Sequence, residues 1–189
     1  MNNKELAEVI TLIGDLLQIK GEVVYKYAAY RKAAESLIDQ ARNASAIYEE
    51  GGVPALKEIP GVGQAIADKI EELLTTGELE FLNKLTAEVP AGLATLLEVP
   101  DLGPKKVKLF YDELGIDTLD KLKAAAEAGE LAGLAGMGKK SEEKILAGIE
   151  SLSRRSGRSN LERAWPLAQE QLDMLRAVPG VKQAEVAGS

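Results

Sequence analysis

The chain has 189 residues, no cysteine, no histidine and a formal net charge of −7. An apolar fraction of 46% is enough for a core, and the missing residue types exclude disulfides, a cysteine zinc site and histidine acid–base chemistry. No apolar run approaches the roughly 20 residues that span a bilayer, and the first residues lack the apolar stretch of a signal peptide. We therefore expect a cytoplasmic protein that does not contact membranes.

Apolar residues at helical spacing predict helices along almost the whole chain. In the first half, the predicted helices cover residues 6–20, about 25–44, a short stretch from Pro54, about 65–74, and a short stretch around 79–85. In the second half, they cover about 105–114, 119–126, 142–153 and 166–177. Residues 156–159 read as a linker, and residues 181–187 are the one good strand candidate. Phe81, Phe110 and Tyr111 sit at helical spacing and are predicted to be packing residues.

One short pattern occurs three times, each time directly before a predicted helix. It reads IPGVG at 59–63, VPDLG at 99–103 and LAGMG at 134–138. Glycines of this kind allow a positive φ and close approach by another group, and a helix that starts there presents free N–H groups to an anion. Three copies make a repeated phosphate-binding hairpin the leading interpretation.

The net charge of −7 argues at first sight against a nucleic-acid partner. The cations, however, gather in short islands at 26–32, 105–108, 139–144 and 154–158. A hairpin that binds phosphate through backbone N–H groups also needs fewer cationic side chains. The charge pattern is therefore compatible with DNA binding.

The order of these motifs resembles the N-terminal half of the family X DNA polymerases, the group that includes DNA polymerase beta and bacterial and archaeal enzymes. Residues 25–34 (YKYAAYRKAA) resemble a helix of that family's lyase-type domain, and residues 59–70 resemble its hairpin. Residues 99–115 resemble the second hairpin, 134–149 an extra unit of the prokaryotic branch, and 179–189 the opening of the catalytic palm.

The resemblance implies an all-α fold of tandem helix-hairpin-helix units in two small helical domains, with a truncated start of an α/β palm at the C-terminus. The expected domains are a lyase-type domain over 1–88, a polymerase arm over 89–153, and a linker with the start of the palm over 154–189. Gly188 and Ser189 match the Gly-Ser pair that begins the nucleotidyl-transfer motif of the family, so the resemblance implies that they bind nucleotide together with the rest of the palm. The aspartates that hold Mg²⁺ follow that point in the family, so we expect no polymerase activity from this chain alone.

The resemblance also implies a lyase lysine. Lys69 matches the lysine that forms a Schiff base with 5′-deoxyribose phosphate. Lys26, Lys57 and Tyr30 match residues around the same 5′-phosphate pocket, and Tyr25 replaces a histidine that lies against a base. Lys26 and Lys57 are expected to lower the pKa of Lys69 by their charge. Ala65 departs from the family pattern, because lyase-active members carry a further phosphate-contacting lysine there.

The hairpins are expected to contact duplex phosphates. The residues assigned to these contacts are the turn glycines and two lysines: Gly61, Gly63, Gly103, Lys105, Lys106, Gly136 and Gly138. Asp101 takes the place of the usual first glycine of the second hairpin, where Asp tolerates the left-handed conformation. In the family such turns hold a monovalent cation, K⁺ or Na⁺, on carbonyls. By position these are the carbonyls of Lys57, Ile59, Val62, Leu97, Val99 and Leu102.

The expected function is binding of DNA at gaps, nicks and 5′-phosphate ends, by a monomer, as part of gap-filling base excision repair. Two other classes remain open. One is a stand-alone helix-hairpin-helix scaffold, and the other is a helical protein-interaction domain. Steep salt dependence would separate both DNA-binding classes from the interaction domain.

Overall fold

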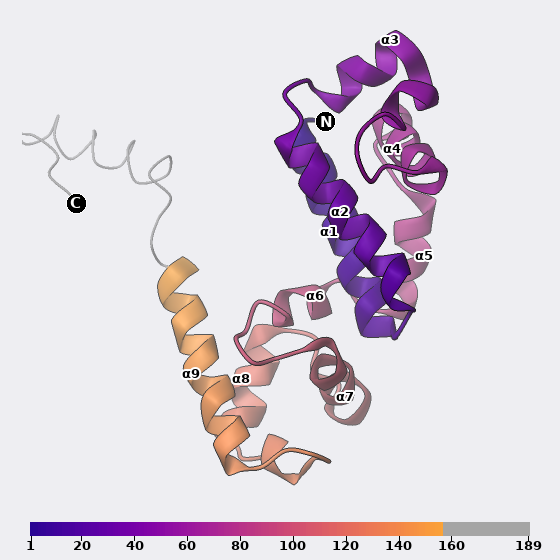
Figure 1. The fold of residues 1–189 in the computed structure, drawn as a ribbon. Coiled ribbons are helices and arrows are strands. Elements are labelled where there is room, and N and C mark those ends of the chain that lie inside the picture. Colours follow the sequence, from indigo (N-terminus) through magenta and orange to yellow (C-terminus); the bar gives the residue numbers. More distant parts are fainter. Residues whose placement is uncertain (157–189) are drawn as a thin grey trace, which may run out of the picture. The chain divides into compact units, whose positions relative to one another are not determined.

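The computed structural model describes residues 1–156, and the side chains as far as Arg154 (Figure 1). Its helices are α1 (Asn3–Lys20), α2 (Val24–Asp39), α3 (Ala44–Leu56), α4 (Gln64–Thr76), α5 (Glu80–Glu88), α6 (Gly92–Leu96), α7 (Pro104–Leu114), α8 (Leu119–Glu127), the 3₁₀ turn η1 (Leu131–Gly133) and α9 (Lys139–Ser156). The part so described contains no strand, which confirms the all-α prediction there. The predicted linker, helix 166–177, strand 181–187, Gly188 and Ser189 fall wholly or almost wholly outside it.

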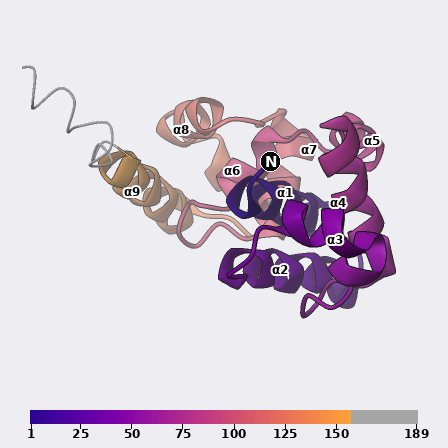
Figure 2. The ribbon, with the colours of Figure 1, turned by 90° about the horizontal axis from the view of Figure 1, so that it is seen from above.

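Helix α1 is the central element of the compact unit formed by Met1–Ile149. Its apolar stripe is buried, with Leu6, Ile10, Ile13 and Leu16 fully shielded from solvent. It packs along α2 and also contacts α5, α6 and α7 (Figures 1 and 2). One helix thus supports elements on both sides of the predicted division near residue 88. The boundary itself stays a prediction.

Both ends of α1 are closed by local sequence. The Asn2 side chain accepts the Glu5 N–H, and the Glu5 carboxylate accepts the Asn2 N–H, which forms a capping box. Gly21 ends the helix in the left-handed conformation at φ 91°, as the Lys20-Gly21 pair predicts.

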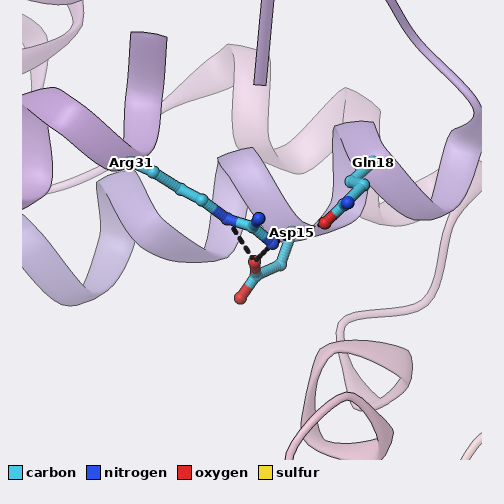
Figure 3. A network of polar contacts seen from close by, with 3 residues as sticks. All are labelled: Asp15, Gln18 and Arg31. Atoms are coloured by element: carbon cyan, nitrogen blue, oxygen red, sulfur yellow. Dashed lines mark hydrogen bonds and ion pairs between the residues drawn. The ribbon is translucent and has the colours of Figure 1, made fainter. Parts of the chain in front are cut away.

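A polar network joins α1 to α2 (Figure 3). The Arg31 guanidinium donates to the Asp15 carboxylate at 2.6 Å and to the Gln18 side chain at 2.5 Å. It also lies 5.7 Å from the centre of the Tyr27 ring. The network fixes α2 against α1, and α2 carries Tyr25, Lys26 and Tyr30.

Two predicted boundaries need correction. The helix predicted over 25–44 ends at Asp39, and a separate helix α3 begins at Ala44. The Asn43 side chain accepts the Ser45 N–H there and caps the new helix, a signal that apolar spacing alone does not carry. The helical turn predicted from Pro54 is the last part of α3, beyond a kink at Gly52 with φ 62°.

The remaining predicted helices within residues 1–156 are confirmed to within a few residues. The short helix α6 and the turn η1 were not predicted, because elements of five and three residues are too short to show an apolar period. No helix in this part of the chain is both long and apolar enough to cross a lipid bilayer.

Candidate nucleic-acid interface

The three hairpins have the same backbone geometry. Gly61, Asp101 and Gly136 occupy the middle of the turns with φ of 82°, 64° and 74°. One residue later, an N–H donates back across each turn. The Val62 N–H donates to the Ile59 carbonyl at 3.0 Å, the Leu102 N–H to the Val99 carbonyl at 3.1 Å, and the Met137 N–H to the Leu134 carbonyl at 3.0 Å. The repeated hairpin predicted from the sequence is therefore present three times.

The last glycine of each hairpin is Gly63, Gly103 or Gly138, and we call these the closing glycines. The prediction that they adopt a positive φ is wrong. Gly63 and Gly103 cap their helices with extended backbones, at φ −85° and −88°. Their carbonyls accept the first helical N–H groups, such as Ala67 at 2.9 Å and Val107 at 3.1 Å. Gly138 likewise accepts from Glu142 at 3.1 Å.

A different property explains glycine at these closing positions. A Cβ built on Gly63, Gly103 or Gly138 meets no atom of the described residues within 4 Å. The space before each helix is therefore open, and glycine leaves the backbone there accessible to a ligand. The open space and the extended backbone are compatible with close approach by a ligand at these three glycines and give no role to a positive φ.

Each hairpin directs the N-terminus of a helix toward that open space. In α4 the N–H groups of Gln64 and Ala65 precede Ile66, whose N–H already bonds to the Gly63 carbonyl at 3.1 Å. In α7 Pro104 has no N–H, so Lys105 provides the corresponding donor, and the Lys106 ammonium donates to the Asp101 carbonyl at 3.2 Å. Such termini favour phosphate through both N–H groups and helix dipole.

Asp101 adopts the left-handed conformation, as predicted, and is the one non-glycine residue with a positive φ among the described residues. Its carboxylate brings a negative charge to a turn that otherwise suits an anion. The left-handed region costs most residues about 1–2 kcal/mol, less for Asp.

Asp101→Gly is expected to raise both the melting temperature and the affinity for duplex DNA, the latter by roughly two- to fivefold at low salt, because it removes backbone strain and a charge. Asp101→Asn separates the two causes, since it removes the charge and keeps a side chain that tolerates the same conformation. Weaker binding by both variants in a fluorescence anisotropy titration would contradict the placement of phosphate at this hairpin.

Lys69 of α4 lies in an aromatic environment. Its ammonium donates to the Ala65 carbonyl at 3.1 Å and sits 4.4 Å from the centre of the Phe81 ring. Phe81 stacks on Tyr30 with the ring centres 6.5 Å apart and the planes at 7°. Tyr30 is 7% exposed, and burial raises the pKa of its hydroxyl. The structure thus brings together Lys69 and Tyr30, which the resemblance assigns to one pocket, and adds Phe81.

Phe81 was expected only to pack, and its contact with Lys69 was missed. The two residues lie on different helices, 12 positions apart, so no periodic pattern connects them. An aromatic residue in the first turn of the helix that follows the lysine-bearing one is the only sequence signal available.

Burial is the main cause of the lowered pKa of Lys69. The Asp68 and Glu72 carboxylates oppose it by raising the pKa, and the charge of Lys26 adds a smaller lowering effect. The predicted contribution of Lys26 is therefore present but secondary. Lys57 is exposed and donates to the Gln64 side chain at 2.9 Å.

The other two residues of the expected pocket lie on the first turn of α2. Lys26 pairs with Glu22 at 2.9 Å, and this bond lowers the pKa of the Glu22 carboxyl. Tyr25 is 78% exposed, so its ring is free to stack on another group.

Among residues 1–156, no group of three or more acidic side chains is placed to hold a metal ion, and the cation predicted at the first two hairpins would bind backbone carbonyls. Two of the six predicted ligands, the carbonyls of Ile59 and Val99, already accept the turn N–H groups. A carbonyl oxygen has two lone pairs, so this bond leaves each with a position for a cation.

Sequence comparison agrees with the repeated hairpins. A family model described as a helix-hairpin-helix domain matches residues 1–79, and one described as a SAM-like helix-hairpin-helix tandem matches residues 93–151. The chain is 33% identical over all 189 residues to the DNA polymerase/3′-5′ exonuclease PolX of Bacillus subtilis (strain 168), of which it covers 32%. It is 36% identical over 72 residues, or 38% of the chain, to DNA polymerase lambda of Arabidopsis thaliana, of which it covers 13%.

The chain therefore spans about a third of the length of the PolX relative and a smaller share of the plant polymerase. The matches cover both halves of the described helical region, and the PolX match runs along the whole chain. The chain belongs to the family X DNA polymerases and corresponds to the N-terminal, helix-hairpin-helix part of a PolX.

Proposed function

We propose that this chain binds DNA through its hairpins, without base preference, as the N-terminal part of a PolX enzyme. The observation that carries the proposal is the open space before three helix N-termini, each behind the same turn. Contacts of backbone N–H groups go to phosphates, which carry no sequence information. The acidic net charge and the small number of contacts predict weak binding, on the order of micromolar at low salt.

The finer proposal is preference for a gap or nick with a 5′-phosphate. Support comes from the cationic side chains of Lys26, Lys57 and Lys69 and from the exposed ring of Tyr25 beside Lys26. The cations would bind the phosphate, and the ring would stack on a neighbouring base. Such ends arise in gap-filling base excision repair, which we propose as the setting. Monomeric action and a K⁺ or Na⁺ ion on the hairpin carbonyls are parts of the same proposal.

A second proposed activity is removal of 5′-deoxyribose phosphate by Lys69. The neutral amine adds to the aldehyde carbon of the open sugar, and loss of water leaves an iminium. Loss of a C2′ proton then supplies the electron pair for a new double bond while the C3′–O bond breaks, which leaves a 5′-phosphate on the downstream strand. Water finally hydrolyses the imine and frees the lysine. The observation in favour is the burial that lowers the pKa of Lys69 and so favours its reactive form.

Binding to gapped duplexes with and without the 5′-phosphate tests the main proposal. Lys26→Ala/Lys57→Ala is expected to reduce the preference for the phosphorylated gap by about tenfold and to weaken duplex binding less, because the hairpin contacts remain. A matched control is Lys121→Ala/Lys123→Ala on α8, which removes the same charge from two exposed i,i+4 ion pairs.

Salt titration and end preference distinguish the alternatives. For DNA binding, log Kd should rise with log salt by about 0.9 per phosphate contacted. A Kd that does not change with salt concentration would favour a protein-interaction domain. Salt-dependent binding with no preference for the 5′-phosphate would favour a stand-alone scaffold.

A further inference from the structure

Phe81, the second residue of α5, lies against the amine of Lys69 and the ring of Tyr30. The ammonium nitrogen is 4.4 Å from the Phe81 ring centre. The other neighbour of the ring, Tyr30, is buried and nearly parallel to it at 7°. Because Tyr30 is held in the core, it restricts the plane of Phe81, and Phe81 in turn restricts where the amine of Lys69 can lie.

We infer that Phe81 is a positioning residue for Lys69, whose ring holds the amine at its face and stabilises the ammonium relative to the free amine. The face of an aromatic ring carries partial negative charge and attracts a cation at this distance, more strongly when water is excluded. The Ala65 carbonyl accepts one N–H of the same ammonium at 3.1 Å, so the amine is held from two directions.

The apolar volume of the Phe81 ring has the opposite effect on the ammonium of Lys69 from that of its aromatic face. Apolar burial disfavours the charged form of Lys69, and burial is the largest cause of its lowered pKa. The other charged groups that act on the amine are Asp68 and Glu72 of α4, which favour the ammonium, and Lys26 of α2, which disfavours it. A test must therefore remove the aromatic face and keep the apolar volume.

Phe81→Leu makes that change, and Phe81→Tyr keeps the ring as the matched control. The pKa of Lys69 is read from the ¹³Cε signal of labelled lysine in the free chain, assigned by its loss in Lys69→Arg. Phe81→Leu should lower this pKa by about half a unit to one unit, the size of one cation–π contact, while Phe81→Tyr leaves it near the wild-type value.

Folding is checked by circular dichroism, and Phe81→Met repeats the comparison with an unbranched apolar side chain if the leucine variant unfolds. An unchanged or higher pKa in a folded leucine or methionine variant would overturn the inference, because it would show that Phe81 acts on Lys69 only as apolar cover.

The consequence for chemistry rests on the proposed lyase activity, whereas the titration does not. If Lys69 forms a Schiff base, Phe81→Leu should speed borohydride trapping on a 5′-deoxyribose phosphate end near neutral pH, by about three- to tenfold, since more of the amine is neutral. A lowered pKa together with no trapping by the wild-type chain would support the role of Phe81 and count against the lyase. Slower trapping by Phe81→Leu despite a lowered pKa would contradict the expected increase in rate and show that protonation of Lys69 does not limit the reaction.

Discussion

Gly63→Val and Gly103→Val are each expected to lower the affinity for duplex DNA by about tenfold or more while the helices stay folded. Valine fits the extended backbone of both positions, and its Cβ would meet no atom of the described residues within 4 Å. A phosphate that approaches the first N–H groups of α4 or α7 would instead meet the new methyl groups. The predicted effect therefore falls mainly on ligand binding, with a smaller effect on helix stability.

Anisotropy titrations at low salt measure the affinity, and thermal melts measure the stability. Valine in place of glycine at the N-cap is expected to cost up to about 1 kcal/mol of helix stability. A loss of DNA affinity larger than this loss of stability is the effect of blocking the phosphate. Gly133→Val is the control, because Gly133 of η1 also faces open space but does not close a hairpin. Wild-type affinity in folded Gly63→Val and Gly103→Val would mean that the hairpins are structural turns.

A substitution at Gly61 would not separate an effect on DNA binding from an effect on the fold. It has φ of 82°, and a Cβ there would lie 3.0 Å from Cγ of Lys32 and 3.4 Å from the Ala33 backbone nitrogen. A side chain would therefore strain the turn and press on α2, and lost binding would not separate the fold from the site. The middle glycine is needed by the protein itself, whereas the closing glycine leaves room for a ligand.

Local sequence was sufficient for most of the helices. In α1, the apolar stripe, the Asn2–Glu5 capping box and Gly21 all act within a few residues, so pattern alone predicts both ends. The boundary between α2 and α3 was missed because alanines continue the apolar pattern of residues 25–44 past Asp39. The division into two helices is accompanied by the Asn43 cap, by the packing of α3 against α4, and by the Asn3 side chain, which donates to the Gln40 and Arg42 carbonyls and accepts the Ala44 N–H.

The candidate site was predictable where it depends on turns and not where it depends on packing. The αL conformation of Asp101 follows from its place in the repeat, and the turn is the same at all three hairpins. The surroundings of Lys69 could not be predicted, since they depend on how α5 folds back to bring Phe81 over α4. The lowered pKa of Lys69 also has a different main cause from the predicted one, which is burial rather than neighbouring cations.

Lys69→Arg is expected to abolish borohydride trapping of the chain on a 5′-deoxyribose phosphate end, while DNA affinity changes by less than about threefold. Arginine keeps the positive charge that attracts phosphate but stays protonated, so it cannot add to an aldehyde. Lys57→Arg is the matched control, because Lys57 is an exposed lysine whose bond to Gln64 an arginine can also make.

The pH dependence of trapping tests the same assignment. Only the neutral amine reacts, so trapping by the wild-type chain should increase with pH and reach its plateau below the range of an exposed lysine, because burial lowers the pKa of Lys69. Lys26→Ala removes a cation that lowers this pKa, so it should move the profile toward higher pH. Trapping by Lys69→Arg at the wild-type rate would assign the chemistry to another lysine, whereas an unchanged pH profile in Lys26→Ala would show that the charge of Lys26 does not contribute to the pKa of Lys69.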